Sequence, residues 1–118
     1  MLDYRCVAIY GWKIAERKNI NKFIKEIESI DEDYFHKAFG QKLMVEDTMR
    51  GEYIYIGARL VYFDPTEDNN EVIINDELIS KSTDEWNKFL EENPNYKKVI
   101  NKWIGDNKPQ LYIFNRIW

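Results

Sequence analysis

Cysteine, histidine, proline and glycine are scarce in this chain of 118 residues, which has one, one, three and five of them respectively. The single Cys6 excludes an internal disulfide and a thiolate metal cluster. We expect a cytoplasmic location, because structural disulfides belong to oxidising compartments. His36 is far from Cys6 in the sequence, and no flanking signature supports a Cys–His nucleophile pair.

Long apolar runs and known catalytic motifs are also missing. No stretch of about 18 apolar residues is present, so we expect no membrane-spanning helix. The sequence contains no Walker A, GxGxxG, GxSxG or HExxH pattern. We therefore expect no enzymatic activity, no cofactor, no metal site and no membrane partner.

An excess of positive charge is lacking as well. Lys and Arg number 17 against 21 Asp and Glu, for a net charge of −4. Direct binding to nucleic acid is not expected, because it needs a basic footprint. Residues 50–56 do not fit an RNA-binding sheet of the RRM kind, because Glu52 stands in the place of a required aromatic. The sequence does not favour that interpretation.

Aromatic and β-branched residues are abundant, and they concentrate in residues 53–63 (YIYIGARLVYF). Such side chains suit a pleated strand, and both faces of this one are largely apolar. The pattern predicts an interior strand with other structure packed on each side. Gly57 interrupts it, and a glycine within a strand often marks a bulge or a close backbone approach.

The rest of the chain divides into alternating strand and helix patterns. Strands are predicted over residues 2–13, 42–46, 71–75 (EVIIN) and 110–118. Helices are predicted over residues 15–30, 32–39, from Ser82 to Asn93, and from Pro94 to Gly105. Ser82 and Glu85 have the spacing of a capping box, which places the start of the third helix at Ser82.

The predicted fold class is α+β, with residues 1–118 forming a single domain. The predicted order is β-α-α-β-β-β-α-α-β. Its simplest solution is a mainly antiparallel sheet of four or five strands with helices packed on one face. A ferredoxin-like variant is one candidate topology, because omitting the short elements leaves β-α-β-β-α-β.

Arginine within strands suggests one kind of binding site. Arg5, Arg59 and Arg116 each interrupt an apolar strand, and arginine suits bidentate recognition of carboxylate or phosphate. Together with neighbouring rings they could hold a small, anionic, nucleotide-like ligand; the candidate rings are Tyr10, Trp12, Tyr53 and Tyr55. The alternative is that each arginine pairs with a local acid or covers an aromatic ring with its stem.

Clusters of acids suggest a different function, which the sequence favours. If they gather on one side of the fold, their field could steer a partner protein with a basic surface into place. The candidate residues are Asp31, Glu32, Asp33, Asp64, Glu67, Asp68 and Glu71. The leading hypothesis is thus a small, acidic, non-enzymatic interaction protein that occludes its partner, as a phage or mobile-element inhibitor of a host nucleic-acid-binding protein would. A homodimer is possible if the C-terminal strand is an exposed edge.

Overall fold

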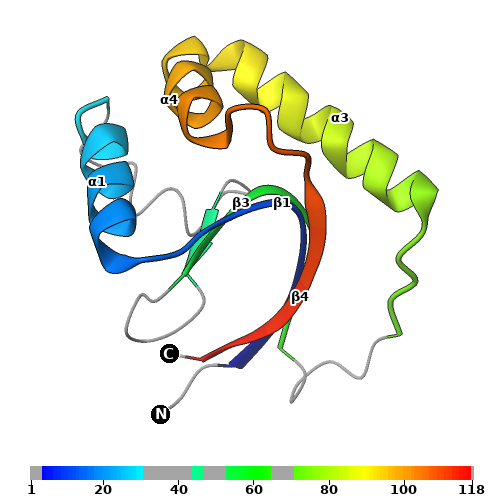
Figure 1. Ribbon diagram of the computed structural model, residues 1–118. Coiled ribbons are helices and arrows are strands. Elements are labelled where there is room, and N and C mark those ends of the chain that lie inside the picture. The colour runs from blue at the N-terminus through cyan, green and yellow to red at the C-terminus, as the bar shows by residue number, and fades with distance from the viewer. Residues whose placement is uncertain (1–3, 31–43, 47–52, 65–70, 118) are drawn as a thin grey trace.

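The computed structural model describes residues 4–30, 44–46, 53–64 and 71–117, and it has the predicted α+β class (Figure 1). Its elements in chain order are β1 (Tyr4–Ile14), α1 (Arg17–Glu28), β2 (Met44–Glu46), β3 (Ile54–Phe63), α3 (Asp76–Glu92), α4 (Pro94–Ile104) and β4 (Gln110–Ile117). The helix predicted over residues 32–39 lies outside the described residues.

The sheet is antiparallel throughout, with the order β2-β3-β1-β4. Three long strands, β3, β1 and β4, make up most of it, whereas four or five were expected. The three-residue β2 pairs only with β3, so β1 is central and β4 is an outer strand. The predicted order of elements is not matched, and the mismatch arises between β3 and α3.

Residues 71–75 were predicted to form a strand, and that prediction is wrong. They have no regular structure, and Ile73 is 68% exposed. Asn75 instead caps α3, because its side-chain oxygen accepts a hydrogen bond of 2.9 Å from the backbone N–H of Leu78. A β-branched composition favours a strand only where a neighbouring strand is available to pair with it.

The predicted start of this helix is also wrong, because α3 begins at Asp76 and Ser82 lies in its interior. The Asn75 cap is followed by Asp76 and Glu77, whose charges favour the positive end of the helix dipole. Two acids and an asparagine therefore begin the helix well before the Ser82 capping-box pattern.

The three described helices pack on one face of the sheet, as predicted. That face of β3 presents Ile54, Ile56 and Ala58, all of which are buried. Each of α1, α3 and α4 contributes an apolar stripe to the core; the buried members are Ile20, Phe23, Ile27, Trp86, Leu90, Tyr96 and Ile100. Side chains at i, i+3, i+4 and i+7 lie on one side of a helix, which is why these residues can all face the sheet.

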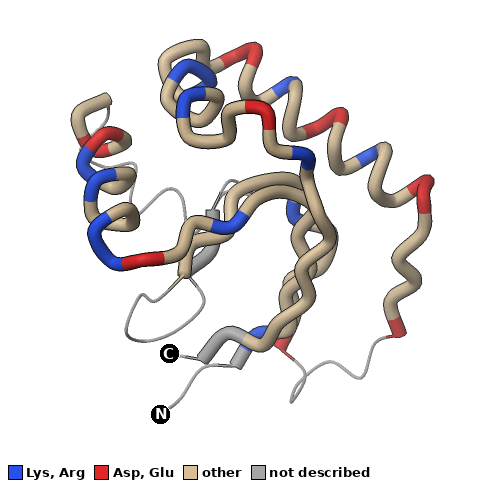
Figure 2. The backbone as a smooth tube through the Cα atoms, in the orientation of Figure 1, with Lys and Arg blue, Asp and Glu red and all other residues tan. Residues whose placement is uncertain are grey.

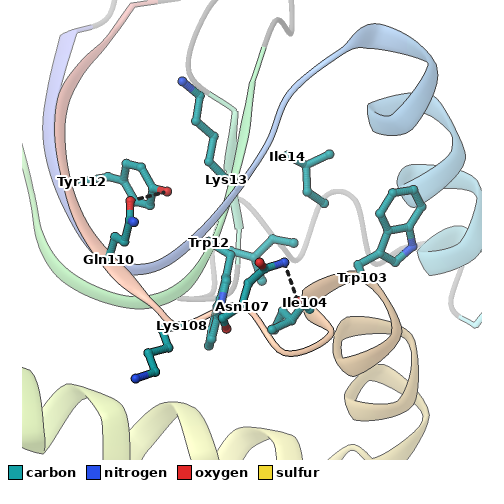
Figure 3. A pocket seen from close by; sticks show the side chains of 10 residues that line it. Trp12, Lys13, Ile14, Trp103, Ile104, Asn107, Lys108, Gln110 and Tyr112 are labelled. Atoms are coloured by element: carbon teal, nitrogen blue, oxygen red, sulfur yellow. Dashed lines mark hydrogen bonds between the residues drawn. The ribbon is translucent and has the colours of Figure 1, made fainter.

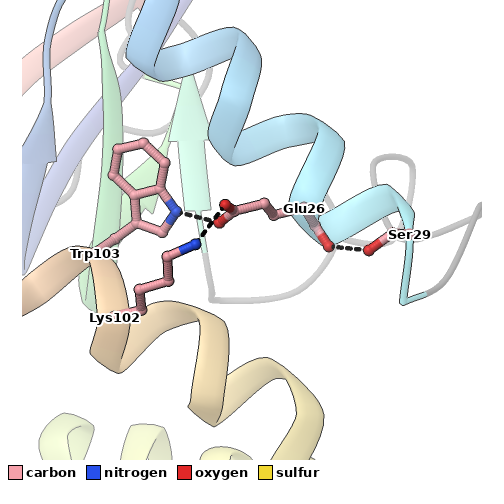
Figure 4. Close-up of polar contacts among 4 residues, drawn as sticks. All are labelled: Glu26, Ser29, Lys102 and Trp103. Atoms are coloured by element: carbon pink, nitrogen blue, oxygen red, sulfur yellow. Dashed lines mark hydrogen bonds and ion pairs between the residues drawn. The ribbon is translucent and has the colours of Figure 1, made fainter.

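A polar contact joins α1 to α4 beside this core (Figure 4). Glu26 accepts hydrogen bonds from Lys102 Nζ at 2.8 Å and from the indole N–H of Trp103 at 2.5 Å. The Trp103 ring also meets the Phe23 ring edge to face, with centroids 5.9 Å apart. These two hydrogen bonds lower the pKa of Glu26 below its ordinary value.

The sheet is strongly curved, as Figure 1 shows, and two local features account for the bend. The register of β1 against β3 shifts between Ala8 and Ile9, where a bulge occurs. Gly11 lies directly opposite Gly57, so the two strands approach each other without side chains. Bulges and glycines are the devices that let a sheet curve.

We expect Gly57→Ala to lower the free energy of unfolding by about 2 kcal/mol or more. A Cβ at this position would lie 2.5 Å from the carbonyl oxygen of Tyr10 and 2.6 Å from the Cα of Gly11. The φ of +148° would add backbone strain. Urea unfolding measures the change, and unaltered stability would show that the close approach of β1 and β3 is not needed.

We expect the contribution of Glu26 to stability to be lost at low pH. Because folding lowers its pKa, the contribution is complete above the ordinary value of 4.5 and disappears as the pH falls through the lower folded-state value. Glu26→Gln should cost about 1 kcal/mol at pH 7. The difference in the free energy of unfolding between Glu26→Gln and wild type should shrink below pH 4.5.

Glu28→Gln is the matched control, since Glu28 is an exposed glutamate on the same helix. Thermal unfolding of the three proteins across the acid range measures the effect. If the loss of stability caused by Glu26→Gln stays constant with pH, the stabilising role of the ionised Glu26 carboxylate is contradicted.

Candidate functional site

The sheet face turned away from the described helices carries a hydrophobic cluster that consists mainly of aromatic rings. We call this side of the sheet the aromatic face. Its members are Val7, Ile9, Tyr53, Tyr55, Tyr62, Tyr112 and Phe114. The Tyr55 ring stacks on Phe114 with centroids 4.1 Å apart and also contacts Tyr112 at 5.2 Å. These contacts hold β3 and β4 together across β1, because all three strands contribute a side chain to the cluster.

Cations lie over the rings at both ends of the aromatic face. Lys13 Nζ is 3.8 Å from the centre of the Tyr53 ring, and Arg59 Cζ is 4.3 Å from the centre of Tyr62. A cation over an aromatic face is worth about 0.5–2 kcal/mol, with the larger values where water is excluded. Two of the predicted ligand-binding residues, Tyr53 and Arg59, are thus engaged within the protein.

The predicted arginine site is only partly assembled. Arg5 forms an ion pair of 3.3 Å with Asp64, whose side chain is 16% exposed, and it also lies 5.9 Å from the Tyr62 ring. Arg116 is opposite Arg5 in the β1–β4 register. Arg5 thus pairs with an acid and the Arg59 guanidinium lies over a ring, so both are engaged within the protein.

The predicted aromatic partners are divided between the two faces of the sheet. Tyr53 and Tyr55 lie on the aromatic face, whereas Tyr10 and Trp12 lie on the opposite face, because neighbouring residues of a strand alternate. Tyr10 and Trp12 therefore cannot share one face of the sheet with Tyr53 and Tyr55 in a common ligand site.

Arg59 has an unusual environment. Its Nη1 atom is buried and, in the part of the chain that the structure describes, has no hydrogen-bond partner. Burial also lowers the pKa of the guanidinium group. An unsatisfied buried donor costs about 1–3 kcal/mol, an amount that the contact with Tyr62 only partly offsets.

Of the acids predicted to form a partner-binding surface, two lie within the described residues. Asp64 is engaged with Arg5, and Glu71 is exposed. The remaining predicted acids lie outside the described residues; they are Asp31, Glu32, Asp33, Glu67 and Asp68. Figure 2 shows acidic and basic positions alternating along α3, so this helix presents charges of both signs.

The edge of β4 that faces away from β1 has no partner strand among the described residues, and the sequence raised it only as a possible dimer contact. Among the described residues, the large hydrophobic side chains that are exposed fall in only two stretches. Leu111 and Ile113 of β4 are 43% and 63% exposed, and Val72 and Ile73 before α3 are 43% and 68% exposed. Alternation along residues 110–118 predicted the strand, but only the sheet order reveals which of its edges lacks a partner.

Comparison with known proteins found no match to the chain among protein-family models, curated proteins or solved structures. None of the described helices combines the length and apolar character needed to cross a membrane. Within the described ranges, no three His, Cys, Asp or Glu side chains gather closely enough to hold a metal ion.

We expect Arg59→Met to leave the free energy of unfolding unchanged or to raise it by about 1 kcal/mol. Methionine is an apolar side chain of similar length that can pack beside Tyr62, and it removes the buried donor that has no acceptor among the described residues. Arg5→Met is the matched control and should cost about 1–2 kcal/mol, because it leaves the half-buried Asp64 carboxylate without this cation. Chemical unfolding distinguishes the two variants, and a larger loss for Arg59→Met would contradict the assignment.

Proposed function

We propose that this protein is a non-enzymatic interaction protein that binds its partner by adding a strand of that partner to the free edge of β4. The observation that supports this is the combination of an outer strand with exposed Leu111 and Ile113. An outer strand presents unpaired backbone N–H and C=O groups, which form a template for another extended chain.

The sequence of β4 favours such pairing. Natural proteins protect outer strands with proline or with charged side chains, especially lysine. From Gln110 to Asn115 the strand has neither, although 32% of the whole chain is charged. A neutral, apolar edge of this kind is retained where the strand has a binding role, because otherwise it would favour aggregation.

Exposed hydrophobic side chains would supply the binding energy. Burying apolar surface contributes roughly 25 cal/mol per Å², and Ile113 is the most exposed large hydrophobic residue among the described side chains of the sheet. Backbone hydrogen bonds would then fix the register of the incoming strand, while Leu111 and Ile113 would select apolar side chains on the same face.

Electrostatic steering by the acidic clusters remains a prediction. The net charge of −4 supports a partner with a basic surface, and an exposed Glu71 is available for it. Steering of this kind raises association rates and weakens with salt, since the Debye length is about 8 Å at physiological ionic strength. An association rate that does not change with salt would exclude the steering and leave the strand pairing in place.

A ferredoxin-like variant is our proposal for the topology. Helix α1 joins β1 to the β2–β3 pair, and α3 with α4 joins β3 to β4. The central position of β1 between β3 and β4 supports this arrangement.

Ile113→Lys tests the proposed edge, because it places a charge in the middle of β4. We expect it to reduce capture of partner proteins from an extract of the native or a related host by tenfold or more. Ile73→Lys is the matched control, since Ile73 has nearly the same exposure but lies outside the sheet. Quantitative mass spectrometry of the captured proteins measures both variants.

Equal capture by the two variants would overturn the proposal. Light scattering during size-exclusion chromatography of the purified protein is the companion measurement. A dimer that Ile113→Lys dissociates would mean that the edge is occupied by a second copy, and this would overturn the binding of a different partner there.

A further inference from the structure

A pocket lies at the place where β1 extends beyond β4. Pairing between these strands ends at Gly11 opposite Gln110, so no described strand borders the last three residues of β1, Trp12–Ile14, on that side. The pocket beside them has a volume of about 400 Å³ and is closed by the end of α4 and the α4–β4 connection (Figure 3). Small-molecule sites typically occupy roughly 300–1,000 Å³.

Hydrogen bonds hold the walls of this pocket in place. The indole N–H of Trp12 donates to the carbonyl oxygen of Asn107 at 2.8 Å, and the Asn107 amide donates to the carbonyl of Ile104 at 2.9 Å. Trp103 on the opposite wall is fixed by its bond to Glu26. A site with walls held in this way loses little conformational entropy when a ligand binds.

The charge of the lining residues contrasts with that of the whole chain. Lys13 and Lys108 line the pocket, and none of its ten lining residues is acidic, although acids outnumber bases in the sequence. Figure 3 shows the two lysine side chains extending away from the other lining residues in different directions. Because Lys13 Nζ lies over the Tyr53 ring, Lys108 is the lysine that we expect to attract an anion to the mouth of the pocket.

Rings and hydrogen-bonding groups complete the lining. Trp12, Trp103 and Tyr112 present aromatic surface, and the side-chain amides of Asn107 and Gln110 lie beside them. Tyr112 donates a hydrogen bond to Gln110 at 3.3 Å, so this pair is already oriented. Aromatic surface suits a planar ring, and amide groups can pair with donors and acceptors on its rim.

We propose that this pocket binds a small anion that carries a planar ring, of the size and chemistry of a nucleoside monophosphate. Lys108 would contact the anionic group, and the tryptophan walls would contact the ring. Among the predicted ligand-binding residues Trp12 is part of this site, whereas Arg5 and Arg59 lie over Tyr62 on the aromatic face. The proposal is independent of strand pairing, because it needs only the free edge of β1 and the α4–β4 connection.

Titration with three probes tests the pocket: AMP, adenosine and inorganic phosphate. Amide chemical shifts in two-dimensional NMR report the affinity and the site, with changes expected at Trp12, Asn107 and Gln110. We expect AMP to bind at least tenfold more tightly than either adenosine or phosphate. A specific site should saturate well below about 10 mM AMP. If AMP binding shows no saturation up to that concentration, the proposal is overturned.

Variants of Lys108 test whether this lysine contacts the anionic group of the ligand. They should not destabilise the fold, because Lys108 is exposed in a connecting segment. We expect Lys108→Gln to weaken AMP binding by threefold or more and Lys108→Arg to retain most of it. Lys88→Gln, at an exposed position on α3, is the control and should have no effect. Equal effects of the two glutamine variants, or equal affinity for adenosine and AMP, would overturn the role of charge in this pocket.

Discussion

The close pairing of β1 with β3 is the constraint on which the rest of the structure depends. Gly11 faces Gly57 across the two strands, and nothing larger than hydrogen fits between them. With the bulge after Ala8, this contact bends the sheet. One face of the bent sheet is covered by the three described helices, and the other carries the stacked rings.

Two sites at the margins of the sheet follow from the unequal lengths and positions of its strands. Because β1 has eleven residues and β4 has eight, β1 continues past its neighbour and forms one wall of the lysine-lined pocket. Because β4 is the last strand of the sheet, its other edge has no partner among the described strands. The two proposals thus share a geometric origin, because each uses a strand that extends beyond its described neighbours.

Arginine shows how a residue type suited to ligand binding can serve the fold itself. Arg5 and Arg59 both lie near the Tyr62 ring, where one pairs with Asp64 and the other keeps a buried nitrogen without an acceptor among the described residues. Their spacing along the chain could not reveal this, because the bulge brings Tyr62 to the same face as Val7 and so between the two cations. A bulge leaves no reliable sequence signal unless a glycine marks it.

The sequence by itself determined the α+β class, the β1, β3 and β4 strands and the buried stripes of the helices. Those features depend on local periodicity, which is visible in residues such as Ile20, Phe23 and Ile27 or in the alternation of residues 53–63. Tertiary structure alone decided that residues 71–75 would remain unpaired, that Trp12 would face a pocket and that Ile113 would lie on an exposed edge. The physical reason is that strand pairing and edge position depend on contacts between residues far apart in the chain, and no local pattern records them.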